Sequence, residues 1–110
     1  MSGVRVCSTA DVAVGAARRF DIEGNRLCVV HLPDVDDGHG GWYAIADECS
    51  HADFSLAEGD VWADEREIEC PKHGSTFSLT TGEPQTLPAT QPVAVYALEV
   101  KDGDVMVVVK

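Results

Sequence analysis

Two short segments of the chain each carry one cysteine and one histidine, and no other feature constrains the fold as strongly. One residue separates Cys49 from His51, two separate Cys70 from His73, and 18 lie between His51 and Cys70. A thiolate and an imidazole so close along the chain can converge on one site without a long loop-closure penalty. The two segments therefore predict one metal site built from two loops.

Each pair mixes the two ligand types, which distinguishes the pattern from a common zinc finger. Structural zinc fingers usually pair cysteine with cysteine and histidine with histidine. Two cysteines and two histidines in mixed pairs are the ligand set of a Rieske [2Fe-2S] centre, in which two cysteines hold one iron and two histidines the other. With Gly59 between the pairs and Gly74 after the second, residues 49–74 resemble the Rieske motif. A Cys2His2 zinc site in a structural interaction module remains the alternative.

The resemblance implies one [2Fe-2S] cluster per chain and assigns its ligands. Cys49 and Cys70 would bind one iron, and His51 and His73 the other. The resemblance also implies that the hydroxyl of Ser75 donates a hydrogen bond to a sulfur of the cluster or of a cysteine ligand. The candidate site therefore consists of these five residues.

Three positions place the chain within the family it resembles. Respiratory Rieske proteins carry two further cysteines that join the ligand loops, but here those positions hold Phe54 and Lys72. Respiratory members also place a tyrosine where this chain has Phe77, two residues after Ser75. The resemblance is therefore to soluble Rieske-type ferredoxins and to the Rieske domains of bacterial oxygenases.

Alternating short apolar runs and turn clusters predict an almost all-β domain of antiparallel sheets, because no segment shows sustained helical periodicity. Turns at Gly24-Asn25 and Asp102-Gly103 are expected to close two hairpins. The capping-box pattern that begins at Ser8 is not expected to lead into a helix, since the valines and glycine after it disfavour one. The expected strands cover residues 4–7, 17–22, 26–32, 42–46, 60–62, 67–70, 76–78, 93–100 and 105–109.

The resemblance implies a Rieske-like fold with a small cluster-binding subdomain at about residues 47–92. Two ligand loops and the proline-rich segment 82–92 would form it, the latter covering the cluster. The distance between the ligand pairs is slightly longer than is usual in the family. The surplus falls in the charged stretch 63–67, which we expect to be a hairpin tip that leaves the ligands undisturbed.

The remaining cysteines and histidines have structural interpretations. Cys7 and Cys28 lie in apolar strand contexts and are expected to be buried free thiols, with a bridge between them as the minor alternative. His31 is expected to be a strand or surface residue with its polar atoms satisfied, and His39 lies in an expected hairpin tip. None of these four residues is assigned to the metal.

Length and charge limit the classes of partner. A chain of 110 residues with no break in composition is expected to be one domain, 1–110, and its early apolar run, 12–17, is too short to span a bilayer. A net charge of −11 argues against nucleic-acid binding and suits docking to basic partners. We therefore expect a cytoplasmic protein.

The sequence shows a cluster motif without catalytic machinery, because it has no facial-triad iron site, dinucleotide fingerprint or nucleophile motif. We expect an electron carrier rather than an enzyme. The resemblance implies a ferredoxin that takes electrons from a reductase and delivers them to an oxygenase, such as an aromatic-ring hydroxylating dioxygenase or a monooxygenase. The alternatives are an accessory ferredoxin of iron-sulfur cluster assembly and a protein like the small subunit of nitrite reductase.

Overall fold

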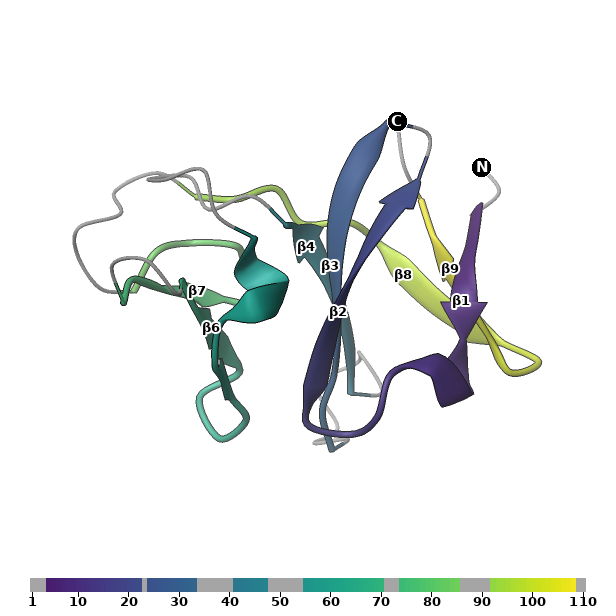
Figure 1. The fold of residues 1–110 in the computed structure, drawn as a ribbon, viewed down its shortest axis with the longest axis horizontal. Coiled ribbons are helices and arrows are strands. Elements are labelled where there is room, and N and C mark those ends of the chain that lie inside the picture. The colour runs from purple at the N-terminus through teal and green to yellow at the C-terminus, as the bar shows by residue number, and fades with distance from the viewer. Residues whose placement is uncertain are drawn as a thin grey trace.

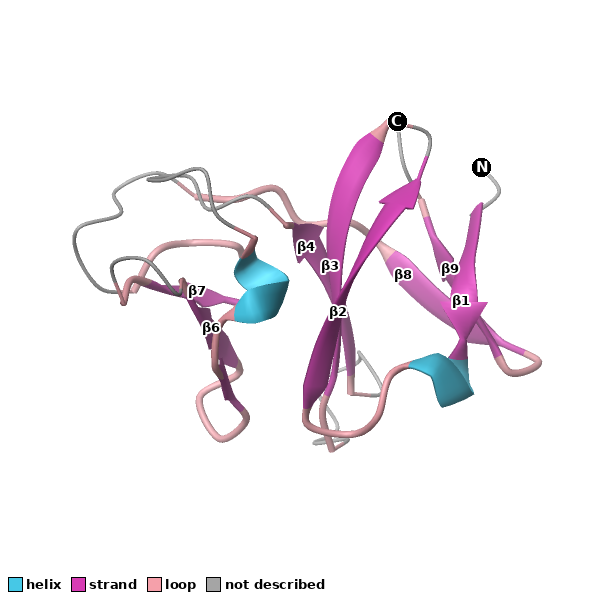
Figure 2. Ribbon diagram, in the orientation of Figure 1, coloured by secondary structure: helices cyan, strands magenta, loops and turns pink. Residues whose placement is uncertain are grey.

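The structure, a computed structural model, describes residues 4–22, 24–33, 41–47, 55–70, 74–85 and 92–108. Nine strands in these ranges form three antiparallel sheets of three strands each (Figures 1 and 2). The central sheet has the order β2 (Ala16–Ile22), β3 (Asn25–His31), β4 (Trp42–Ala46). The terminal sheet has the order β1 (Val4–Ser8), β9 (Asp104–Val107), β8 (Leu98–Lys101), and the small sheet has the order β5 (Val61–Trp62), β6 (Glu67–Glu69), β7 (Thr76–Ser78).

The central sheet lies between the other two because two of its strands are apolar on both faces. In β3, residues 27–30 are all fully buried. Successive side chains of a strand point to opposite faces. Cys28 and Val30 pack in the core cluster that contains Ile68 and Phe77 of the small sheet, whereas Val29 packs in another cluster with Val105 of the terminal sheet. The unbroken apolar run thus serves two cores, and Figure 1 shows the resulting three layers.

The strands follow the predicted pattern with one main correction, in the segment 93–100. The strand β8 begins only at Leu98. Before it, the N–H of Tyr96 donates to the carbonyl of Ala44 and the N–H of Ala46 donates to the carbonyl of Ala94. These bonds, with a single bridge between Ile45 and Val95, attach the segment to the edge of β4 without a continuous ladder. The predicted strand therefore divides between two sheets.

The turn prediction at Asp102-Gly103 is confirmed, and the one at Gly24-Asn25 is wrong by one residue. Asp102 and Gly103 have φ angles of 53° and 81° between paired Lys101 and Asp104. This two-residue connection with two positive φ angles is the hairpin turn whose twist matches the strands. Asn25 already belongs to β3 and pairs with Ile22, so the turn ends at Gly24.

The described residues contain two short 3-10 turns, and the first corrects the expectation that the capping pattern near the N-terminus leads to no helix. Thr9–Asp11 forms a single turn, in which the Ser8 hydroxyl accepts from the N–H of Ala10 and the Asp11 carboxylate accepts from the N–H of Ser8. The cap satisfies the donors of one turn, and extended backbone at Val12 ends it. The second turn, Leu56–Glu58, was not predicted and places a buried leucine in the core.

The thiols of Cys7 and Cys28 are free and buried, as predicted. Burial raises the pKa of both thiols, and the nearby charge of Asp47 adds to the effect at Cys28. His31 is a strand residue whose Nδ1 lies 3.0 Å from the carbonyl oxygen of Val12 and whose ring stacks on Trp42. His39 lies outside the described residues. Within the described ranges, no helix is both long enough and apolar enough to cross a membrane.

Candidate metal centre

Of the five predicted site residues, the structure describes Cys70 and Ser75, and both are fully buried. Cys49, His51 and His73 lie outside the described residues. Cys70 directly follows β6, and Ser75 directly precedes β7. The described pair therefore marks the two ends of the loop that carries His73.

Backbone hydrogen bonds close this second ligand loop. The N–H of Cys70 donates to the carbonyl of Ser75 at 2.7 Å, and the N–H of Gly74 donates back to the carbonyl of Cys70 at 3.0 Å. Gly74 has a φ of 76°, a left-handed conformation that glycine adopts without strain. The paired residues Glu69 and Thr76 fix the base of the loop, so its two described ends lie close together.

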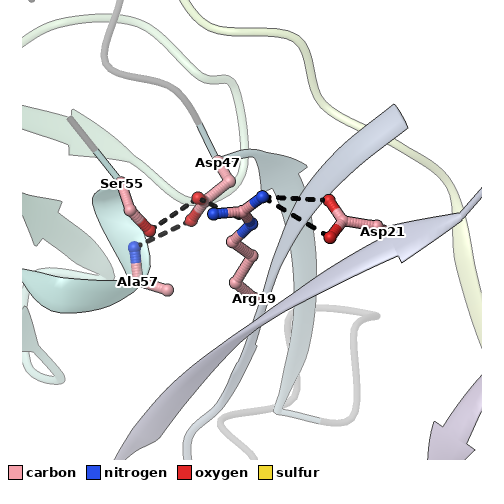
Figure 3. Close-up of polar contacts among 5 residues, drawn as sticks. All are labelled: Arg19, Asp21, Asp47, Ser55 and Ala57. Carbon is pink, nitrogen blue, oxygen red and sulfur yellow. Dashed lines mark hydrogen bonds and ion pairs between the residues drawn. The ribbon is translucent and has the colours of Figure 1, made fainter. Parts of the chain in front are cut away.

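The ends of the first ligand loop are held together around Asp47, a residue that the sequence analysis did not assign to the site. Asp47 follows β4 and is two residues before Cys49. Its carboxylate accepts hydrogen bonds from the Ser55 hydroxyl and from the N–H of Ala57, beyond the loop (Figure 3). The signal in the sequence was an aspartate directly after the apolar strand, but its partners are not local and could not be inferred.

Both ligand loops are anchored in one core. Leu56, which ends the first loop, and Cys70, which begins the second, belong to the same cluster of buried residues as Ile45 and Phe77. Residues 63–66 form the turn between β5 and β6, so the predicted hairpin tip at 63–67 is confirmed except for Glu67, which already belongs to β6 and pairs with Trp62. The Arg66 guanidinium donates to the Pro33 carbonyl at 2.7 Å and thereby ties this hairpin to the chain after β3.

The proline-rich segment 82–92 is anchored at both ends. The N–H of Gly82 donates to the Ser78 carbonyl, and the N–H of Val93 donates to the Gly82 carbonyl, both at 2.8 Å. Pro84 forms a bridge with Phe77, which brings the start of the segment against β7. Residues 86–91, which were expected to cover the cluster, lie outside the described ranges.

The chemistry of the donor set fits an iron-sulfur cluster. Thiolates are the common ligands of iron-sulfur clusters, and imidazole also suits iron. Cys70 presents its sulfur from a buried position at the end of a hydrogen-bonded loop, and Ser75 adds a buried hydroxyl at the other end.

Comparison with known proteins identifies the family. Residues 2–97 match the family model described as "Rieske [2Fe-2S] domain". The 3-phenylpropionate/cinnamic acid dioxygenase ferredoxin subunit of Escherichia coli (strain K12) is 38% identical over 107 residues, which cover 97% of this chain and 93% of that protein.

Solved structures agree with this match. The ferredoxin of carbazole 1,9a-dioxygenase from Nocardioides aromaticivorans IC177 superposes with a TM-score of 0.88 at 35% identity, with all of both chains covered. A chain in a complex of reduced oxygenase and oxidized ferredoxin in carbazole 1,9a-dioxygenase gives 0.78 at 39% identity, over 94% of this chain and 90% of that one. The chain therefore belongs to the Rieske [2Fe-2S] family and carries a [2Fe-2S] cluster.

Proposed function

We propose that this chain is the ferredoxin component of an oxygenase system, a one-electron carrier that accepts electrons from a reductase and delivers them to a terminal oxygenase such as an aromatic-ring hydroxylating dioxygenase. The observation that carries the proposal is the 38% identity to a dioxygenase ferredoxin subunit across 97% of the chain. The TM-score of 0.88 to the ferredoxin of a second dioxygenase supports it independently. When bound, the cluster supplies a one-electron couple.

The ligand assignment is part of this proposal. Cys49 and Cys70 bind one iron, and His51 and His73 bind the other. The backbone hydrogen bonds among Cys70, Gly74 and Ser75 support the assignment of the second pair, Cys70 and His73, because they hold the two described ends of that loop together. Ser75, whose backbone carbonyl accepts from the Cys70 N–H, is proposed to donate its hydroxyl to a sulfur of the cluster or of a cysteine ligand.

The same features support a role as a carrier rather than an enzyme. The motif that could carry chemistry consists of the proposed cluster ligands. The two relatives are named as a ferredoxin subunit and as a ferredoxin. The proposal includes one domain over residues 1–110, a cytoplasmic location and no binding of nucleic acid, the last because the net charge is −11.

The test is a reconstituted electron-transfer chain. Cluster-loaded protein is combined with reductases and terminal Rieske oxygenases from the same genome, with NADH or NADPH as electron source, and the bleaching of the visible absorbance is followed. The cognate reductase should bleach the spectrum, and oxygenase with substrate and oxygen should restore it. His73→Ala, which removes a proposed ligand, serves as the control. Product formation that is the same with and without this chain for every pair would contradict the proposal.

A further inference from the structure

Asp47 combines a charged side chain with complete burial. Its relative exposure is 0%, and an uncompensated buried carboxylate is strongly unfavourable. Both oxygens are compensated in Figure 3: Oδ2 accepts from the Ser55 hydroxyl at 2.6 Å, and Oδ1 accepts from the N–H of Ala57 at 2.9 Å. The residue is thus held in one position by several partners.

The backbone of Asp47 takes part in the same connection. Its carbonyl accepts from the N–H of Leu56 at 2.5 Å, and its N–H donates to the Arg26 carbonyl at 3.0 Å. Through its backbone and carboxylate together, this one residue bonds to three consecutive residues beyond the loop, 55–57, and to the central sheet behind it. We call this set of contacts the Asp47 clasp.

A cation on the central sheet completes the clasp. Arg19 on β2 places its Nε 3.9 Å from Oδ2 of Asp47, and its Nη2 lies 3.4 Å from both carboxylate oxygens of Asp21. The two aspartates differ in environment, since the Asp47 side chain is fully buried and the Asp21 side chain is 63% exposed. A buried charge is screened far less than an exposed one, so only Asp47 acts strongly on its surroundings.

We propose that Asp47 is a positioning residue of the cluster site: the clasp closes the loop that carries Cys49 and His51, and its buried negative charge lowers the reduction potential of the cluster. This inference rests on the proposed ligand assignment. The loop leaves Asp47 and returns at Ser55, so fixing these two ends restricts where both ligands can lie. A fixed negative charge near a redox centre disfavours the added electron.

A purely structural role is the competing explanation, because Asp47 also satisfies the first N–H groups of the 3-10 turn Leu56–Glu58. The two roles predict different potentials. A residue that only caps the turn affects folding and leaves the potential of an assembled cluster unchanged, whereas a positioning charge shifts it.

Asp47→Asn separates the two roles, and Asp21→Asn is its matched control. The first variant keeps an oxygen to accept from Ala57 and removes the buried charge, and the second removes the same charge from the exposed partner of the same arginine. Protein-film voltammetry should give a more positive potential for Asp47→Asn and an unchanged one for Asp21→Asn. Equal potentials for Asp47→Asn and wild type would overturn the proposal.

Ser55→Ala provides a second variant if Asp47→Asn assembles no cluster. It removes one hydrogen bond to the carboxylate while keeping the charge, and iron release to a chelator should be about 10- to 150-fold faster, the factor for loss of one hydrogen bond to a charged group. Release at the wild-type rate would overturn the clasp. Failure of the ligand assignment appears separately, as a wild-type protein whose reduced EPR spectrum lacks a Rieske signal.

Discussion

Replacing Gly82 with alanine should destabilise the protein at the start of the proline-rich segment. Gly82 has a φ of 78°, and a Cβ built there would lie 2.1 Å from the carbonyl oxygen of Val93 and 2.9 Å from Cγ2 of Val95. The nearest atom belongs to the backbone and cannot rotate away. The chain near Val93 must therefore move, which breaks the hydrogen bond between the Val93 N–H and the Gly82 carbonyl.

The expected loss has three parts. A left-handed backbone costs a non-glycine residue about 1–2 kcal/mol, an overpacked contact costs about 1–3 kcal/mol, and the lost hydrogen bond costs about 0.5–1.5 kcal/mol. The free energy of unfolding should therefore fall by about 2.5–6.5 kcal/mol. Because this segment is expected to cover the cluster, iron release should become faster as well.

Gly103→Ala is the matched control, since Gly103 has a φ of 81° but no atom within 4 Å of the built Cβ. This variant should lower the free energy of unfolding only by the cost of the left-handed backbone, about 1–2 kcal/mol. Urea unfolding of both cluster-loaded variants, followed by far-UV circular dichroism and visible absorbance, gives the comparison. If the two variants lose the same stability, the close approach of Gly82 to Val93 does not exist in the protein.

Three further outcomes are expected. Ser75→Ala should lower the reduction potential and Phe77→Tyr should raise it, each by at most about 60–130 mV, the equivalent of one hydrogen bond to a charged acceptor; voltammetry that finds both unchanged would refute this account. His73→Ala should lose the cluster and melt earlier, because metal binding contributes to folding; an unchanged melting temperature would show a self-sufficient core. Reduction by the cognate reductase should slow as salt rises, since the chain carries a net charge of −11; a stopped-flow rate that is flat or rising with salt would instead indicate apolar docking.

The strands β3 and β4 of the central sheet were predictable because their apolar runs are long and bounded by turn residues. Residues 27–30 and 42–46 needed only local pattern to be placed in strands. Their arrangement between two other sheets was not predictable, because an unbroken apolar run does not say which sheet covers each face. The segment 93–97 was misassigned for the same reason: its apolar residues attach to β4 through two backbone bonds rather than continue β8.

The candidate site, like the fold, was predictable from the sequence only in part. The ligand residues could be proposed from spacing, because the chemistry of a metal site restricts both residue types and distances along the chain. The Asp47 clasp could not, since it depends on Arg19 from another strand and on Ser55 beyond the loop. Such contacts are set by tertiary packing, and an aspartate after a strand usually indicates a turn or an exposed position.

The most direct test of the central claim is pulsed EPR of the dithionite-reduced protein, prepared anaerobically with 15N-labelled histidine and compared with an unlabelled sample. If Cys49, His51, Cys70 and His73 hold the cluster, the reduced spectrum should show coupling to two histidine nitrogens, and substitution of either His51 or His73 should abolish it. A reduced [2Fe-2S] signal without histidine coupling, or a colourless protein with stoichiometric zinc and no EPR signal, would contradict the account.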